Sequence, residues 1–464
     1  MHIYDSVQKT KLSFEPIRQG EASIYVCGPT VYDDAHLGHA RSSLSFDLLS
    51  RTLKALNYKV TMGKNFTDID DKIIKKVEES GKSMEEITSF YIDRYLQDMT
   101  AIGIQRPATE SIQAIENMIQ TLIDKDMAYV ISSGDVYFDT GKDTHYGSIS
   151  HQVGEDEDNQ SRVAHTSEKR NPKDFALWKA CKANEDICFD AAFSSGRPGW
   201  HIECSAMIEK HFAQSHGTKE YSIDIHGGGA DLLFPHHENE AAQSRCATGH
   251  ELAKYWMHNG FVQIDGEKMS KSLGNSFFLK DALKVYDGEV LRYYLNAVHY
   301  RNDFNFSEEE LLTSKKRLDK LYRLKKRVSP GKASAVSQTF KKALLDAMRD
   351  DLNISIALAV IDDMVATAND TLDADSKNKG FKKEVLANIA FIDTLLGFGG
   401  KEPFSYFQIG VDEALKKEIE TLLTERSDAK KEKNFARSDA IRDQLIALGV
   451  SIMDTADGTL WEKT

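Results

Sequence analysis

Two histidines and a glycine between two apolar stretches could form a nucleotide site. His36, Gly38 and His39 follow the apolar residues 24–26 and precede residues 40–56, where leucines recur mostly at helical spacing. The pattern predicts a strand, a turn and a helix. A helix N-terminus suits phosphate because its backbone N–H groups are unpaired and carry partial positive charge. Gly38 would let a flat base or a ribose approach the backbone. The alternative is a helix start with two solvated histidines.

Two lysines farther along the chain could bind a second part of such a ligand. Lys268 and Lys271 lie in the run Lys-Met-Ser-Lys-Ser, just after a predicted strand at 261–264. Lysine is a compact point charge suited to phosphate. A loop of this kind can neutralise the charge that develops when a triphosphate loses pyrophosphate. Taken alone, the run would more often be a solvated basic loop.

Four further side chains have the chemistry of a zinc shell. His236 and Glu240 lie four residues apart on a predicted helix and therefore share a face. Cys27 ends the strand at 24–26, and Cys204 lies on a separate segment. Two thiolates, an imidazole and a carboxylate can bind zinc. Spacing alone does not decide this, because each cysteine could equally be a small buried hydrophobic residue.

The elements around these residues predict an α/β fold with a parallel sheet. The strand at 24–26, the helix at 40–56 and a strand at 58–62 alternate, which favours right-handed crossovers in one sheet. Ligands bind outside the carboxyl ends of such strands. Cys27 and Thr67 would both lie there. After an interruption, the pattern resumes with a helix after Trp200, a strand at 221–225 and a helix from about His237.

Length, composition and missing motifs narrow the function. A chain of 464 residues with 41% hydrophobic content predicts several domains, and the net charge of −13 argues against a nonspecific DNA coat. We expect a cytoplasmic protein without a membrane span, because no long apolar run or signal-peptide pattern is present. Five scattered cysteines favour free thiols or a metal site over a disulfide framework. Neither GxGxxG after the first strand, nor GxxxxGK[ST], nor HExxH is present, which disfavours a dinucleotide oxidoreductase, a P-loop ATPase and a zinc protease.

The motifs together resemble one family. Residues 36–39 resemble the HIGH signature of class I aminoacyl-tRNA synthetases, with leucine at the second position, and residues 268–272 are the KMSKS signature. Four longer stretches are similar to bacterial cysteinyl-tRNA synthetases: residues 27–32, 65–72, 199–207 and 224–240. The resemblance covers essentially the whole chain.

This resemblance implies an activity. The enzyme would activate L-cysteine with ATP to give cysteinyl-adenylate and pyrophosphate, and would then transfer cysteine to the 3′ end of tRNA(Cys). Cys27, Cys204, His236 and Glu240 would hold one Zn²⁺ that binds the substrate thiolate and rejects serine without editing. ATP would bring Mg²⁺, and we expect a monomer without an obligate protein partner.

The resemblance also implies roles for other residues. His36 and His39, with Lys268 and Lys271, would be catalytic and would bind ATP, together with Gly38. Thr67, Trp200 and Asp231 would line the cysteine pocket. The remaining cysteines lie outside the family's motifs and are taken as structural: Cys181, Cys188 and Cys246.

A Rossmann-like, doubly wound catalytic domain with an inserted connective block is expected, followed by an α-helical bundle and a small C-terminal domain. The expected boundaries are 1–105 and 196–260 for the two catalytic halves, 106–195 for the insertion, 261–310 for the KMSKS-bearing linker domain, 311–396 for the bundle that contacts the tRNA stem, and 397–464 for the anticodon-binding domain.

Two sets of charged residues, one basic and one with both acidic and basic side chains, are candidates for RNA contact. Lys315, Lys316 and Arg317 begin a basic run that could contact phosphates, although it could also be a solvated helix. Asp439, Arg442 and Asp454 could read exposed base edges.

Three other functions remain open at this stage. A relative that joins activated cysteine to a small amine would lack residues such as 311–464. A noncatalytic paralogue should have lost His36, His39, Lys268 or Lys271. A simple nucleotidyltransferase would not need the four metal-binding residues or the length of the chain.

Overall fold

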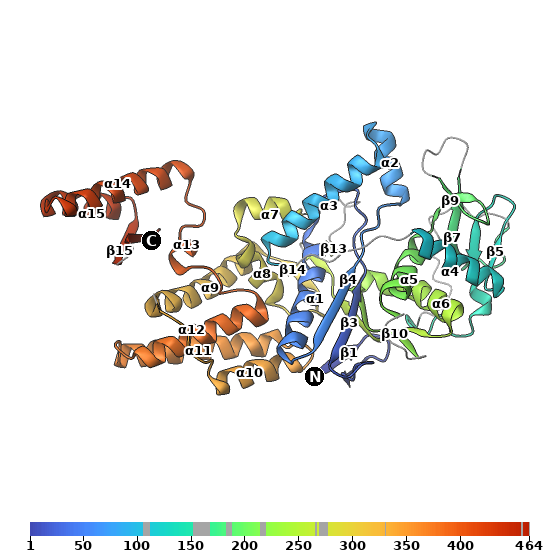
Figure 1. Ribbon diagram of the computed structural model, residues 1–464, viewed down its shortest axis with the longest axis horizontal. Helices are drawn as coiled ribbons and strands as arrows, with labels where there is room; N and C mark the ends of the chain where they lie inside the picture. The colour runs from blue at the N-terminus through green and yellow to red at the C-terminus, as the bar shows by residue number, and fades with distance from the viewer. Residues whose placement is uncertain are drawn as a thin grey trace. The chain divides into compact units, whose positions relative to one another are not determined.

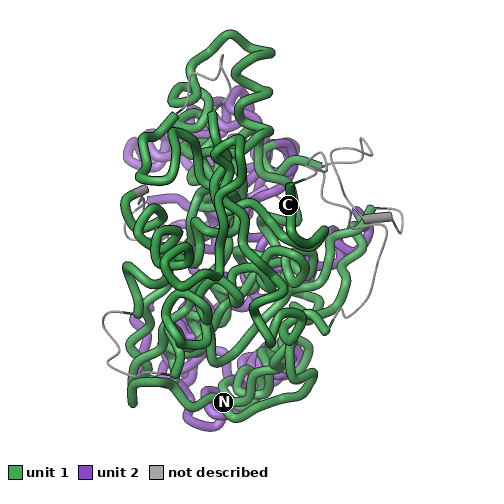
Figure 2. Tube along the Cα trace, turned by 90° about the vertical axis from the view of Figure 1, so that its right-hand side faces the viewer, with its two compact units in different colours: residues 1–280, 295–307, 345–357 green, residues 281–294, 308–344, 358–464 purple. Residues whose placement is uncertain are grey.

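The computed structural model describes residues 1–104, 112–151, 168–181, 188–213, 220–264, 267–268, 277–329, 331–455 and 458–463. The chain forms two compact units, which Figure 2 distinguishes by colour. Unit 1 comprises Met1–Lys280, Leu295–Ser307 and Leu345–Ala357, and unit 2 comprises Asp281–Tyr294, Glu308–Leu344 and Leu358–Thr464.

A four-stranded parallel sheet with the order β11-β10-β3-β4 forms the centre of unit 1, and Figure 1 shows α1 alongside it. The predicted α/β architecture is therefore confirmed. The elements of this part are β1 (His2–Asp5), β2 (Thr10–Ser13), β3 (Glu21–Val26), α1 (Leu37–Ala55), β4 (Lys59–Lys64), α2 (Asp71–Ser80), α3 (Met84–Ala101), α5 (Trp200–His211), β10 (Tyr221–Gly229), η4 (Ala230–Leu232), η5 (Leu233–His237), α6 (Glu238–Thr248) and β11 (Glu251–Asn259).

The sequence patterns did not predict strand β11. It is a buried edge strand parallel to β10, and its apolar residues do not alternate with polar ones. A strand covered on both faces loses the period-2 pattern that identifies strands. The left-handed Gly249, which ends α6, and the apolar residues that follow it were the available signals.

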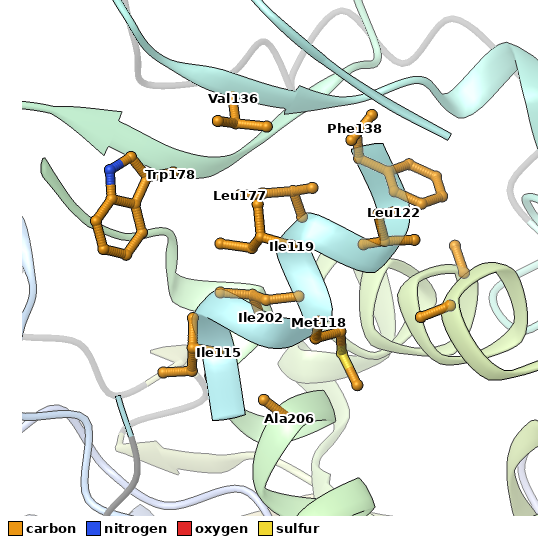
Figure 3. Close-up of a cluster of buried hydrophobic side chains, with 13 residues drawn as sticks. Ile115, Met118, Ile119, Leu122, Val136, Phe138, Leu177, Trp178, Ile202 and Ala206 are labelled. Carbon is orange, nitrogen blue, oxygen red and sulfur yellow. The ribbon is translucent and has the colours of Figure 1, made fainter. Parts of the chain in front are cut away.

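The insertion folds around an antiparallel sheet with the order β5-β6-β7-β9-β8. Helix α4 packs Ile115, Ile119 and Leu122 against this sheet, and α5 adds Ile202, as Figure 3 shows. The elements are α4 (Ile112–Asp124), β5 (Ala128–Val130), β6 (Val136–Phe138), η1 (Thr140–Lys142), β7 (Phe175–Ala180), β8 (Phe189–Asp190) and β9 (Ser195–Pro198).

The expectation of free thiols or a metal site was wrong for two cysteines in this region. Cys181 and Cys188 form a disulfide. Cys181 follows β7 and Cys188 precedes β8, and both strands pair with β9. The sheet therefore brings the two side chains together, which spacing in the sequence did not reveal. Cys246 is a free thiol, as expected.

Unit 1 also contains a small sheet with the order β13-β12-β14, formed by β12 (Val262–Ile264), β13 (Glu267–Lys268) and β14 (Phe304–Phe306). Lys268 therefore begins its run on a short strand, antiparallel to β12. Lys271 lies outside the described residues.

Unit 2 is mainly helical, as the sequence predicted for residues 311–396. The described part of the last 15 residues forms the hairpin β15–β16, which packs with α14 and α15 around Ile419, Ile441 and Trp461. The remaining helices and strands, some of which continue into unit 1, are α7 (Leu279–Val285), α8 (Gly288–Asn296), α9 (Glu308–Val328), α10 (Gln338–Arg349), α11 (Ile354–Ala374), α12 (Lys379–Leu396), α13 (Pro403–Tyr406), α14 (Glu413–Lys431), α15 (Phe435–Ala447), β15 (Val450–Thr455) and β16 (Gly458–Lys463).

Candidate active site and metal centre

The carboxyl ends of β3 and β4 bring the first candidate residues together. Cys27 directly follows β3, and a backbone bridge joins Thr30 to Thr67 after β4. Gly28 packs so closely on this loop that an added Cβ would lie 1.6 Å from the carbonyl oxygen of Asn65. Only glycine therefore allows the two loops to approach each other at this point.

Cys27, Cys204, His236 and Glu240 meet in one buried cluster. One potential ligand atom from each lies within 4.8 Å of the others. Glu240 Oε1 lies 2.7 Å from His236 Nε2 and 3.3 Å from Cys27 Sγ. Cys27 Sγ lies 3.7 Å from Cys204 Sγ. The residues come from the end of β3, from α5, from η5 and from α6. Four buried donors of these types within this distance fit a divalent metal ion such as zinc.

The cluster continues into a group of histidines that the sequence did not single out. His226 Nε2 lies 2.5 Å from Glu240 Oε2, and its Nδ1 lies 3.1 Å from the carbonyl oxygen of Tyr25. His237 lies beside it and contacts His258 through ring nitrogens 2.8 Å apart. Cys27, His226, His237 and Glu240 make a second possible ligand set that shares two residues with the first. The strand predicted at 221–225 extends through His226 to Gly229 as β10, which places the His226 side chain in the cluster.

The ionisable groups of the cluster influence one another strongly. Burial, reinforced by Cys204 and Glu240, raises the pKa of the Cys27 thiol well above its usual range. The hydrogen bond from Cys27 lowers the pKa of Cys204. Burial alone would lower the pKa of His236, but Glu240 and Cys204 raise it to about 10. Burial would likewise raise the pKa of Glu240, but His236 and His226 hold it well below its usual range.

The pKa values of His237 and His258 are lowered, whereas that of His236 is raised. Burial, helped by the neighbouring His226, lowers the pKa of His258 to about 3 and that of His237 well below its usual range. Both rings are therefore neutral at physiological pH, and they surround the cluster without adding positive charge.

Trp200 lies beside this cluster, and Thr67 hydrogen-bonds Glu203, the residue before Cys204. The indole of Trp200 stacks on the ring of His236, with centroids 4.2 Å apart, and remains 38% exposed. Thr67 is buried. Asp231 is an exposed residue of the short η4 turn after β10. Glu203, which the sequence did not suggest, is buried beside Thr67, and burial raises its pKa well above its usual range.

His36 and His39 cap the N-terminus of α1. Nδ1 of His36 accepts a hydrogen bond from the backbone N–H of Gly38, and Nδ1 of His39 accepts one from that of His36. Their rings stack with centroids 3.7 Å apart. This capping begins the helix at Leu37, three residues before the expected start. Because both Nδ1 atoms accept, the neutral rings carry their protons on Nε2, which can donate.

Comparison with known proteins identifies the family of this chain. Residues 13–316 match the family described as tRNA synthetases class I (C) catalytic domain, and residues 412–461 match the Cysteinyl-tRNA ligase anticodon binding domain. A cysteine–tRNA ligase from Sulfurovum sp. (strain NBC37-1) is 79% identical over 468 residues, covering all of both chains. The chain belongs to the cysteinyl-tRNA synthetase family. A cysteine–tRNA ligase from a Nitratiruptor species is 60% identical over the same full length.

Solved structures support the class I fold of this cysteinyl-tRNA synthetase family member. A methionyl-tRNA synthetase from Mycobacterium tuberculosis aligns with a TM-score of 0.61 over 82% of this chain and 92% of its own, at 14% identity. At that identity the likeness concerns the fold alone.

The candidate RNA-contact residues of this family member differ in their surroundings. Lys315 pairs with Asp319 at 3.0 Å, and Arg317 hydrogen-bonds Tyr293, whereas Lys316 is exposed. Asp439 and Arg442 are exposed on α15. Asp454 pairs with Arg426 at 2.8 Å and Lys430 at 2.6 Å, which hold its pKa well below its usual range.

None of the helices in the described part of the chain has both the length and the apolar character that a membrane crossing requires.

Proposed function

We propose that this protein is a cysteine–tRNA ligase that forms cysteinyl-adenylate from L-cysteine and ATP, releases pyrophosphate, and transfers cysteine to the 3′ end of tRNA(Cys). The main support is one combination: full-length identity of 79% to a cysteine–tRNA ligase, with a thiol-rich donor cluster at the carboxyl ends of the central strands. This reaction belongs in the cytoplasm, where protein synthesis uses charged tRNA.

Cys27, Cys204, His236 and Glu240 would hold one zinc ion. The fit rests on the donor types and on burial, because each of these residues is at most 7% exposed. When bound, zinc would supply a thiophilic Lewis acid that favours a thiolate over a hydroxyl. Cysteine and serine are near isosteres that an apolar pocket separates poorly. Such a site would select cysteine without an editing reaction.

The neighbouring side chains would orient the amino acid. Trp200 stacks on His236 and is 38% exposed, so it would line one side of the pocket, and Thr67 would add a hydroxyl. Asp231 would pair with the substrate ammonium. These three residues would form the proposed cysteine pocket, with the substrate thiol at the metal ion that the cluster would hold.

The nucleotide would lie at the N-terminus of α1. Nε2 of His36 and of His39 would donate to phosphate oxygens, and the helix N-terminus would add its partial positive charge. Gly38 brings its backbone N–H to His36, and a Cβ there would lie 2.9 Å from the His36 ring. Lys268 and Lys271 would neutralise the pyrophosphate, with Mg²⁺ accompanying ATP.

A stripe on α9 would contact the phosphate backbone of tRNA. Lys316, Lys320 and Arg323 recur at positions i, i+4 and i+7 and are exposed. Among the described residues, none of the three has an ion-pair partner, whereas Lys315 and Arg327 are paired. On α15, Asp439 and Arg442 face solvent and would read anticodon bases. Asp454 would accept from a base while its two cations fix its position.

Aminoacylation with purified components tests this proposal. The protein, ATP, Mg²⁺ and radiolabelled cysteine should charge a tRNA(Cys) transcript and should not charge one with an altered anticodon. Replacing Lys316, Lys320 and Arg323 by glutamine should raise the KM for tRNA and flatten its dependence on salt, because each phosphate contact contributes to that slope. Lys315→Gln is the matched control. Charging of no tRNA with cysteine would refute the proposal.

A further inference from the structure

The chain that follows the Lys-Met-Ser-Lys-Ser run is joined to the histidine segment by its backbone. His36 and Phe278 form an antiparallel bridge. The N–H of Leu37 donates to the carbonyl of Phe277 at 3.2 Å, and the N–H of Leu279 donates to the carbonyl of Ala35 at 2.8 Å. The two segments are more than 230 residues apart in sequence, and all of these residues belong to unit 1.

A buried carboxylate lies beside this bridge. The side chain of Asp34 is 10% exposed. The ammonium of Lys280 donates to Oδ2 of Asp34. Nη2 of Arg94, on α3, lies 3.3 Å from Oδ1, but the pair lacks hydrogen-bond alignment. Lys280 is thus the closer partner of Asp34. Arg94 is a second cation that reaches the same carboxylate from another element.

We propose that Asp34 is a positioning residue for adenylate formation, acting through its ion pair with Lys280. The pair fixes the chain that leaves the KMSKS signature against the residues that cap α1. The inference rests on the proposed function, because it assigns Asp34 a role in the ATP half of that reaction.

Two features connect this ion pair to the chemistry. Asp34 lies two residues before His36, so a shift of Asp34 moves the histidine that caps α1. Lys280 lies two residues after Phe278, and Lys271 precedes Phe277 by six residues in the sequence. The ion pair therefore ties together the ends of both segments that would contact the triphosphate. Misplacing a reacting group by about 1 Å can slow a reaction about a hundredfold.

Three variants test the proposal by ATP–pyrophosphate exchange. Lys280→Met removes the cation on the segment, Asp34→Asn removes the carboxylate charge with little change of shape, and Arg94→Met is the matched control that removes the other cation. We expect Lys280→Met and Asp34→Asn to lower exchange about tenfold to a hundredfold, with a raised KM for ATP. The KM for cysteine and the bound metal should not change. Arg94→Met should keep wild-type exchange within about threefold.

The double variant Asp34→Asn/Lys280→Met separates positioning from general stability. If the two residues act as one pair, the double variant is no slower than the worse single variant, because coupled residues are not additive. Thermal unfolding of each variant shows that it is folded at the assay temperature.

Equal effects of Lys280→Met and Arg94→Met, or multiplied effects in the double variant, would overturn the assignment of Asp34. In either case the wild-type protein would still exchange pyrophosphate in a cysteine-dependent way. Absence of exchange in the wild-type protein would instead refute the proposed function.

Discussion

The protons on the four donor side chains determine how the candidate site takes up a metal ion. The pKa of Cys27 is raised well above its usual range by burial, and that of His236 is raised to about 10 by Glu240 and Cys204 against the effect of burial. At neutral pH both side chains therefore hold a proton when no metal is bound. Thiolates and neutral imidazoles are the forms that bind metal, so uptake must displace these protons.

Zinc binding to the metal-free protein should release at least two protons at neutral pH, one from Cys27 and one from His236. Since both groups hold their protons more tightly as the pH falls, the affinity should fall with pH, by up to about a hundredfold per unit for two protons. Calorimetry in buffers of different ionisation enthalpy, repeated from pH 6 to 8, measures both quantities. Zinc uptake without proton release, and a zinc affinity that does not change with pH, would contradict this charge assignment.

Replacing a single thiol distinguishes a ligand from a buried neighbour. Cys204→Ser should reduce the metal content from about one ion per chain to well below half, because the hydroxyl is a poor zinc ligand. Cys246→Ser is the matched control, since Cys246 is a free thiol outside both possible ligand sets. Elemental analysis after dialysis gives the result. Equal metal content in the two variants would exclude Cys204 as a ligand.

The loops after β3 and β4 hold the site together at the scale of elements. Much of this arrangement could be predicted from the sequence, because the strand, turn and helix around His36 follow local patterns. The place of His226 and strand β11 could not, since the predicted strand at 221–225 ended before His226 and an unbroken apolar stretch conceals β11. The pair between Asp34 and Lys280 was also inaccessible, because only the folded chain brings together residues 246 positions apart.

Gly28→Ala should disrupt the contact between these loops. The added methyl group would lie 1.6 Å from the Asn65 carbonyl oxygen, which is backbone and cannot move aside alone. We expect a loss of stability of about 4 kcal/mol or more, in the range of severe point mutations. Gly380→Ala, whose Cβ would meet only Asn378 Oδ1 at 3.6 Å, is the control and should be near neutral. Thermal unfolding measures both, and a melting temperature unchanged by Gly28→Ala would contradict the packing.

At the scale of the whole molecule, the residues proposed for adenylate formation and those proposed to read the anticodon belong to different units. Apart from Lys271 and the side chain of Lys268, which lie outside what the structure describes, the residues proposed for adenylate formation are described in unit 1. The C-terminal block has its own core of Ile419, Ile441, Leu445, Val450 and Trp461. Sequence motifs predicted this division of roles. The disulfide depended on the pairing of β7 and β8 with β9, which local patterns do not specify.

Deletion of residues 412–464 should therefore affect only the RNA step. Cysteine-dependent pyrophosphate exchange should stay within about threefold of the full chain, whereas tRNA charging should fall at least about a hundredfold as anticodon contacts are lost. Phe435→Ala, an exposed aromatic residue on α15, should weaken charging without changing exchange. Equal losses in both assays would show that the block supports the catalytic unit itself.

Selection of cysteine by a metal ion is the central claim, and pyrophosphate exchange tests it most directly. Exchange is measured with cysteine and with serine, on metal-loaded protein and after complete removal of the metal. The account predicts exchange with cysteine, almost none with serine, loss of activity on metal removal and its return when zinc is restored. Exchange with cysteine that survives complete metal removal would contradict it.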